Sequence, residues 1–217
     1  MSMKIDNFDI ESLRESVKGR MDSRRYSHTL GVERAAEAIG QIYLPQMTDS
    51  LRCAALLHDI TKNESVEKQL QYCREFDIII GDSDKISPKL LHAKTAAELI
   101  LREYPAYVTD DIVSAVRWHT TGKDGMSIFD IIIYLADYIE DTRTFDDCVR
   151  LREYFWGSDP RNMTENDRII HLYKTAVLSV DLTLKSLMGE NAFIDEDTVR
   201  FRNYCLHEIN VQEKGVN

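Results

Sequence analysis

The feature that most constrains this fold is the stretch 54–62, where an apolar helical run ends in an adjacent histidine and aspartate. His58 and Asp59 follow two alanines and two leucines, and Lys62 comes three residues later. A buried charge without a partner costs several kcal/mol, so a buried histidine and aspartate must be hydrogen-bonded, paired or bound to a metal. We therefore consider His58 and Asp59 candidate metal ligands. The dipeptide alone has a simpler explanation, a hydrogen-bonded core histidine beside a helix-terminal charge, because so short a motif recurs by chance.

Composition limits the classes of protein to which the chain can belong. Its 217 residues are 43% hydrophobic and 29% charged, which suits one compact domain with a sizeable core. The formal charge of −10 leaves no broad basic face for a nucleic acid duplex, so an anionic substrate would need a local cationic pocket. The cysteines form no CxxC pair, and we interpret all four as reduced structural thiols. They are Cys53, Cys73, Cys148 and Cys205.

No segment has the length that a membrane span or a signal peptide requires. The longest purely apolar run, 131–136, is far too short to cross a bilayer. Residues 1–7 lack the apolar centre of a signal peptide. The sequence therefore predicts a cytoplasmic protein without a membrane partner.

Apolar residues recur at helical spacing along nearly the whole chain, which predicts an all-α bundle. Residues 78–80 could form a strand alone, but no second β-rich run exists for them to pair with. Start signals are expected at Asp49 or Ser50, at the Ser87-Pro88 pair, at Asp110 and at Ser127. The expected helices cover about 9–18, 23–43, 51–58, part of 63–87, 88–100, 110–119, 128–139, 145–156, 166–188 and 195–208.

Several apolar stripes end on a histidine or an aspartate. The stripes place His28, His92 and His119 on the apolar faces or inner ends of separate helices. Asp137 lies four residues after Ile133 in a strongly apolar helix, so we expect its side chain to be buried. The two remaining histidines, His171 and His207, are interpreted as ordinary helical residues.

Together these residues predict a metal centre in the core of the bundle. Four neutral histidines and two carboxylates would otherwise all need buried partners, and one metal centre satisfies them together. Imidazole and carboxylate ligands without thiolate suit iron, manganese, nickel or zinc, and the absence of cysteine ligands argues against a closed structural zinc site. The six residues are His28, His58, Asp59, His92, His119 and Asp137.

The order of these motifs resembles the HD superfamily of metal-dependent phosphohydrolases, whose signature is a histidine, a His-Asp pair and a later aspartate. His28, His58-Asp59 and Asp137 match it in order. The longer strings are similar to the bacterial YqeK-like symmetrical bis(5'-nucleosyl)-tetraphosphatases. These strings are Arg25-Tyr26-Ser27-His28-Thr29-Leu30-Gly31-Val32, Leu57-His58-Asp59-Ile60-Thr61-Lys62, Leu90-Leu91-His92, His119-Thr120-Thr121-Gly122 and Tyr134-Leu135-Ala136-Asp137-Tyr138-Ile139-Glu140-Asp141-Thr142-Arg143.

The resemblance implies a single HD domain over 1–217, with an HD core of about 20–142 and a C-terminal helical extension of about 143–212. It implies one or two divalent metal ions, first of all iron held by His28, His58, Asp59 and Asp137. It also implies symmetrical cleavage of diadenosine tetraphosphate into two ADP. Two departures bear on substrate fit and not on the ligands: Ala93 stands near where the family often has glycine, and Asp141 where it often has proline.

Further residues have roles that the sequence leaves open. His92 and His119 could hold a second metal with Asp59 bridging, or could bind phosphates directly. Lys62 and Arg143 are expected to act in catalysis with Asp59 by neutralising the polyphosphate and the leaving group. Thr120, Thr121 and Gly122 could bind a phosphate or merely end a helix. The residues expected to contact substrate are Lys62, His92, His119, Thr120, Thr121, Gly122, Asp137 and Arg143.

Two alternatives to this function stay open at the level of sequence. An HD-type 5'-nucleotidase, or another nucleotide phosphohydrolase, would share the same four-residue core. A helical module that senses nucleotides without turnover is the alternative of another class. The apolar stripes of the C-terminal helices could belong to the core or to a dimer face, and we expect a homodimer.

Overall fold

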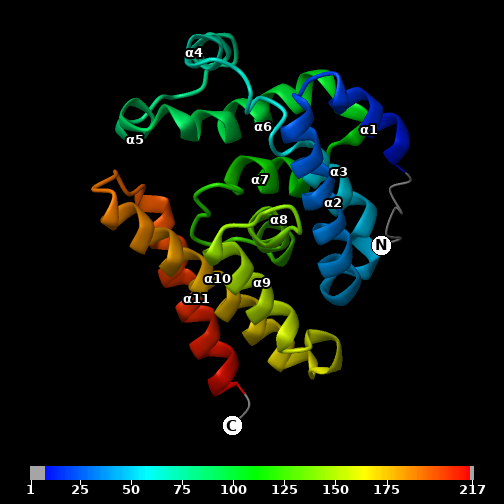
Figure 1. Ribbon diagram of the computed structural model, residues 1–217, viewed down its shortest axis with the longest axis vertical. Coiled ribbons are helices and arrows are strands. Elements are labelled where there is room, and N and C mark those ends of the chain that lie inside the picture. The colour runs from blue at the N-terminus through cyan, green and yellow to red at the C-terminus, as the bar shows by residue number, and fades with distance from the viewer. Residues whose placement is uncertain (1–7, 216–217) are drawn as a thin grey trace.

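The computed structural model describes residues 8–215 and is helical throughout this range (Figure 1). No strand occurs among these residues, so the prediction of an all-α fold is confirmed. Residues 1–7, on which the signal-peptide expectation rested, lie outside the described residues. The helices are α1 (Ile10–Lys18), α2 (Ser23–Tyr43), α3 (Thr48–Leu57), α4 (Val66–Glu75), α5 (Asp82–Ile86), α6 (Leu91–Glu103), α7 (Asp110–Trp118), α8 (Ile128–Ile139), α9 (Asp146–Gly157), α10 (Glu165–Gly189) and α11 (Glu196–Lys214), with 3₁₀ turns at Pro45–Met47, Pro88–Leu90, Pro105–Tyr107 and Pro160–Asn162.

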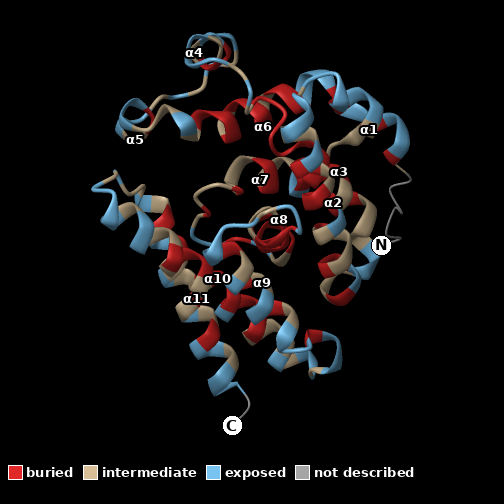
Figure 2. Cartoon of the chain, viewed as in Figure 1, coloured by how far each residue is buried: buried red, intermediate tan, exposed pale blue. Residues whose placement is uncertain are grey.

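Helix α8 lies at the centre of the molecule and is buried along most of its length (Figure 2). Helices α2 and α3 pack against each other and against α8, while α6 and α7 close another side. Helices α10 and α11 pack together as a C-terminal hairpin beside α8 and α9. This arrangement brings α2, α3, α6, α7 and α8 to one junction in the core.

The predicted helix starts are correct where a polar side chain caps the helix. Ser127 accepts a hydrogen bond from the backbone N–H of Asp130, whose carboxylate accepts from the N–H of Ser127, which forms a capping box. The cap expected at Asp49 or Ser50 is wrong, because the turn Pro45–Met47 runs directly into α3. The side chain of Ser87 caps no helix either, since Pro88–Leu90 forms a 3₁₀ turn before α6.

Burial agrees with the expected pattern except at Asp137, and one helix is longer than expected. All four cysteines are buried, as expected for structural thiols. The Asp137 side chain retains 18% of its accessible surface, so it is only partly buried, near the end of α8. Helix α11 extends to Lys214, six residues beyond the expected end at Glu208, because the buried Ile209 continues its apolar face. No helix within residues 8–215 is long and apolar enough to cross a membrane.

Candidate metal centre

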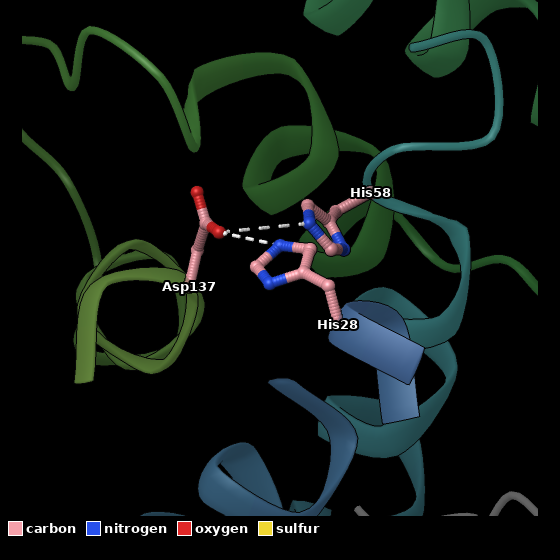
Figure 3. A group of neighbouring side chains, drawn as sticks. All are labelled: His28, His58 and Asp137. Atoms are coloured by element: carbon pink, nitrogen blue, oxygen red, sulfur yellow. Dashed lines mark ion pairs between the residues drawn. The ribbon is translucent and has the colours of Figure 1, made fainter. Parts of the chain in front are cut away.

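The core junction collects the predicted side chains from five helices. His28 comes from the first half of α2, and Asp137 from the last turn of α8. His58 and His119 are the residues at which α3 and α7 end, and His92 lies in the first turn of α6. Figure 3 shows how His28, His58 and Asp137 converge.

Three of the histidines are held in one tautomer by the backbone. Each Nδ1 lies within hydrogen-bond distance of the carbonyl oxygen three residues earlier. A carbonyl oxygen can only accept, so Nδ1 carries the proton and a neutral ring keeps its lone pair on Nε2. The contacts are His58 to Ala55 at 2.6 Å, His92 to Lys89 at 2.6 Å and His119 to Val116 at 2.8 Å. All three Nε2 atoms therefore face the junction as ligand atoms.

The carboxylate of Asp59 lies between two groups of imidazoles. Its Oδ2 is 3.3 Å from Nε2 of His58 and 3.9 Å from Nε2 of His28. Its Oδ1 is 3.2 Å from Nε2 of His92 and 3.5 Å from Nε2 of His119. Each oxygen of one buried carboxylate thus faces two ring nitrogens.

Asp137 completes the group on the Oδ2 side. Its Oδ1 lies 2.9 Å from Nε2 of His28 and 3.9 Å from Nε2 of His58. We name the group His28, His58, Asp59 Oδ2 and Asp137 subsite A. The group Asp59 Oδ1, His92 and His119 is subsite B. The two subsites share Asp59.

The buried polar atoms of the junction are better placed to bind a cation than to hydrogen-bond with one another. Buried Nε2 of His28, buried Nε2 of His58 and buried Oδ1 of Asp59 have no well-aligned hydrogen-bond partner among the described residues. In subsite B, Nε2 of His92 and Nε2 of His119 lie 3.1 Å apart, although both are lone-pair atoms when the rings are neutral. A divalent cation satisfies all of these atoms at once, and imidazole with carboxylate is a donor set that iron, manganese, nickel and zinc accept.

Two side chains that the sequence pattern did not reveal support the ligands from behind. Glu140 is buried, and its Oε1 accepts a hydrogen bond from Nδ1 of His28 at 3.0 Å. Arg25 donates from Nη1 to Oδ2 of Asp59 at 2.6 Å. Such partners orient metal ligands in proteins. The sequence spacing could have revealed them, because Arg25 lies one helical turn before His28 and Glu140 lies one helical turn after Asp137.

The local charges shift the pKa of several groups in the metal-free protein. Burial lowers the pKa of His28, but the adjacent carboxylates of Asp137 and Glu140 outweigh it and raise this pKa to about 9. Burial lowers the pKa of His92 to about 4, against the opposing effect of Asp59.

The two carboxylates stay ionised although they are largely shielded from solvent. Burial raises the pKa of Asp59, yet His58 and the other imidazoles hold this pKa well below its ordinary value. For Asp137, burial again opposes ionisation, and Arg143 with His28 holds the pKa well below its ordinary value.

The two predicted cations lie beside different subsites. Nζ of Lys62 is 3.1 Å from Nε2 of His92, next to subsite B, and burial lowers the pKa of this lysine. Arg143 donates from Nη2 to Oδ1 of Asp137 at 2.5 Å, next to subsite A. The structure thus brings both cations to the junction.

Of the three residues after His119, only Thr120 has its side chain in the junction. Its Oγ1 lies 3.2 Å from Nε2 of His92. Thr121 donates its hydroxyl to the carbonyl of Gly122. Gly122 donates its backbone N–H to the carbonyl of Trp118 at 2.9 Å and, at φ +67°, packs against Phe201. This backbone hydrogen bond lies just past the end of α7, and phosphate binding by Gly122 stays a prediction.

A cavity of about 560 Å³ opens beside subsite A. Its walls are the first residues of α2, the segment 140–145 between α8 and α9, and Asn63. His28 lies in its wall, together with Arg24, Arg25 and Arg143. Buried Nε of Arg25 and buried Nε of Arg143 have no hydrogen-bond partner among residues 8–215. The cavity thus joins a candidate metal ligand to guanidinium groups, whose charge and geometry suit an anion.

Comparison with known proteins supplies an independent finding. The HD domain family model matches residues 25–142. A symmetrical bis(5'-nucleosyl)-tetraphosphatase from Bacillus subtilis is 31% identical over 192 residues, covering 88% of this chain and 94% of that protein. A protein of the same name from Staphylococcus aureus is 29% identical over 159 residues, covering 72% and 80%.

A solved structure has the same fold over nearly the whole chain. It is described as a predicted HD superfamily hydrolase involved in NAD metabolism from Clostridium acetobutylicum. The TM-score is 0.79 at 28% sequence identity, with 93% of this chain and 98% of that chain covered.

Proposed function

This chain belongs to the HD-domain family, in its branch of symmetrical bis(5'-nucleosyl)-tetraphosphatases, and we propose that it hydrolyses diadenosine tetraphosphate into two ADP. The observation that carries the proposal is the Asp59 carboxylate, each oxygen of which faces two imidazole nitrogens. Beside it opens a cavity whose arginines suit a polyphosphate. The enzyme is thus a metal-dependent phosphohydrolase with a dinucleotide substrate.

We assign the metal to the imidazole nitrogens and carboxylate oxygens that converge at subsite A. His28, His58, Asp59 and Asp137 would hold the first ion, and iron is the metal we propose, with manganese, nickel or zinc as alternatives. A divalent metal held there supplies Lewis acidity, which lowers the pKa of a water molecule and draws charge from the phosphoryl oxygens. Arg25 and Glu140 keep Asp59 and His28 in the ligating orientation.

The remaining residues bind the substrate and neutralise its charge. In symmetrical cleavage, water adds to an inner phosphorus, the bond from that phosphorus to the central bridging oxygen breaks, and ADP leaves as an anion. Arg143 lies at the subsite A side and Lys62 at the subsite B side, so they can stabilise the phosphoryl oxygens and the leaving ADP. The Thr120 hydroxyl can donate to a phosphate from its position beside His92.

We propose further that subsite B holds a second ion, with Asp59 bridging. The close approach of Nε2 of His92 to Nε2 of His119 supports this, since both nitrogens also lie within 3.5 Å of Oδ1 of Asp59. The alternative role for His92 and His119 is direct binding of phosphate. The HD core of about 20–142, the homodimer and a cytoplasmic location stay predictions.

The products of the reaction test the proposed function. Metal-loaded protein incubated with diadenosine tetraphosphate should yield ADP alone, measured by anion-exchange chromatography. AMP together with ATP would contradict symmetrical cleavage. Free phosphate with nucleoside would identify a nucleotidase. Protein that binds nucleotide but can be neither isolated with metal nor reconstituted with it would be a sensor.

A further inference from the structure

Phe145 has a position that neither the fold nor helix α9 accounts for. The residue retains 66% of its accessible surface, so it is one of the exposed large hydrophobic residues of the protein. It is the N-cap residue of α9, where it makes no side-chain cap hydrogen bond. Serine, threonine, aspartate and asparagine are favoured at that position because their oxygens accept from the first helical N–H groups. The backbone carbonyl of Phe145 accepts from the N–H of Val149, but its side chain supplies no cap to the helix.

Phe145 is one of the residues that line the cavity beside subsite A. The same cavity is lined by His28, a candidate metal ligand, and by Arg24, Arg25 and Arg143. Arg25 and Arg143 hold Asp59 and Asp137, so they lie at the metal end of the cavity. Arg24 is exposed and forms no ion pair with any described residue. One cavity therefore presents cations near the candidate metal ligands and an exposed aromatic face elsewhere in its wall.

This arrangement has the chemistry of a nucleotide subsite. Guanidinium groups match phosphate oxygens in geometry and charge, and an aromatic ring stacks on a base through its π face. Because the phosphates must reach the candidate metal ligands, the attached nucleoside extends along the cavity away from them. We propose that Phe145 stacks on one nucleobase of the dinucleotide and favours a purine, whose larger ring gives more overlap than a pyrimidine. This inference rests on the proposed function and adds the residue that binds the base.

Separate measurements of base binding and phosphate binding test the proposal. The probes are ADP and inorganic pyrophosphate, each titrated calorimetrically into the metal-loaded protein. Phe145→Ala should weaken ADP binding roughly five- to 150-fold, the range measured when stacking aromatics are removed. Pyrophosphate should bind the variant as it binds the wild type, since it has no base. Wild-type affinity of Phe145→Ala for ADP would overturn the inference.

Further variants separate stacking from simple apolar contact. Phe145→Trp should keep wild-type ADP affinity, while Phe145→Leu should lose it, because leucine fills space without a π face. Equal ADP affinities for Phe145→Leu and wild type would refute stacking. Phe193→Ala is the matched control: Phe193 is also exposed, at 38%, but lies between α10 and α11, outside the cavity. It should bind both probes normally, and loss of ADP affinity there would also count against the inference.

The proposed function and the stacking role can fail separately. If the wild type cleaves diadenosine tetraphosphate into ADP and Phe145→Ala binds ADP normally, the function stands and the inference falls. If the wild type binds ADP through Phe145 but cleaves no dinucleotide, Phe145 still belongs to a nucleotide-binding subsite, and the proposed function is wrong.

Discussion

Asp59 is the residue on which both subsites depend. Asp59→Ala removes an oxygen from each subsite and leaves four buried imidazoles around an incomplete site. We expect the variant to lose bound metal and activity together, measured by elemental analysis and by ADP formation. Full metal content with wild-type turnover would show that the central role assigned to Asp59 is wrong.

Lys62→Ala and Arg143→Ala are the controls for Asp59→Ala, because they remove charge and no metal ligand. Each should keep its metal. Each should lose transition-state stabilisation of about 2 to 4 kcal/mol, or roughly thirty- to a thousand-fold in rate. Loss of metal from Arg143→Ala would mean that its bond to Asp137 mainly orients a ligand.

Alanine variants of His92 and His119 distinguish a second metal ion in subsite B from direct phosphate binding. If both ligate a metal in subsite B, His92→Ala and His119→Ala should each halve the metal content of the purified protein. If they bind phosphate instead, metal content should be unchanged and nucleotide affinity should fall. Elemental analysis and calorimetry on the same preparations provide both measurements.

His28 should make the stability of the metal-free protein depend on pH. Its pKa is raised from 6.5 to about 9 in the folded state, so its contribution is complete below pH 6.5 and is lost as pH rises through 9. We expect the melting temperature of the metal-free protein to fall across this window. In His28→Gln that part of the pH dependence should disappear, and an unchanged slope in the variant would contradict the assignment.

Sequence could predict some of these residues and not others, for physical reasons. Apolar stripes indicated that His28, His92 and His119 face inward, and the structure brings them to one junction. Arg25 and Glu140 were missed because a charged residue near a helix end has no burial signature in sequence. Only the packing of α2 against the end of α8 brings Glu140 within reach of His28. Metal binding by these side chains stays a prediction.

At the scale of elements, the close approach of α2 to the end of α8 depends on Gly31. A Cβ atom on Gly31 would lie only 2.2 Å from Oε2 of Glu140. Glu140 cannot easily move, because Thr142 donates to it from both its hydroxyl and its backbone N–H. The glycine therefore permits the contact that orients His28.

Gly31→Ala should consequently impair the site through Glu140. We expect a lower melting temperature and weaker metal binding, even though alanine is the better helix former. Gly157→Ala is the matched control, because Gly157 ends α9 and a Cβ atom there would meet nothing within 4 Å. Its melting temperature and metal affinity should not fall. Equal metal affinity in Gly31→Ala and wild type would exclude this role for Gly31.

Helix boundaries were predictable to different degrees. Where a side chain caps the helix, as Ser127 does, the local sequence was sufficient. The start of α3 was misplaced because a proline turn leads into it without a break, so no cap is needed. The Asp137 side chain was expected to be buried. Its exposure depends on the path of the segment 140–145 after α8, and apolar spacing within a helix does not specify that path.

At the scale of the whole molecule, the site joins five helices that are far apart in sequence. The pairing of each Asp59 oxygen with particular histidines follows from the packing of α3 against α2, α7 and α8 and of α6 against α7, which no local pattern specifies. The resemblance to the HD superfamily supplied what local patterns lacked, because the family signature gives the candidate ligands in their order along the chain. The all-α class needed only periodicity and the lack of β-rich runs.

The same junction predicts how metal removal should affect the molecule. Without metal, buried lone-pair atoms in the core have no partner, so chelation should destabilise the fold. Free metal at a hundred times its Kd adds about 2.7 kcal/mol, which corresponds to a melting temperature higher by roughly 5–10 °C. Calorimetry of the chelated and the reconstituted protein measures this shift.

The loss of protection on chelation should also be local. Amide hydrogen exchange should increase in α2, in α7, at the start of α6 and at the ends of α3 and α8, because these elements supply the candidate ligands. The α10–α11 hairpin supplies none of them and should exchange at the same rate with and without metal. A uniform increase over both regions would mean that the ion stabilises the fold as a single unit, and no change in either would place the metal outside this junction.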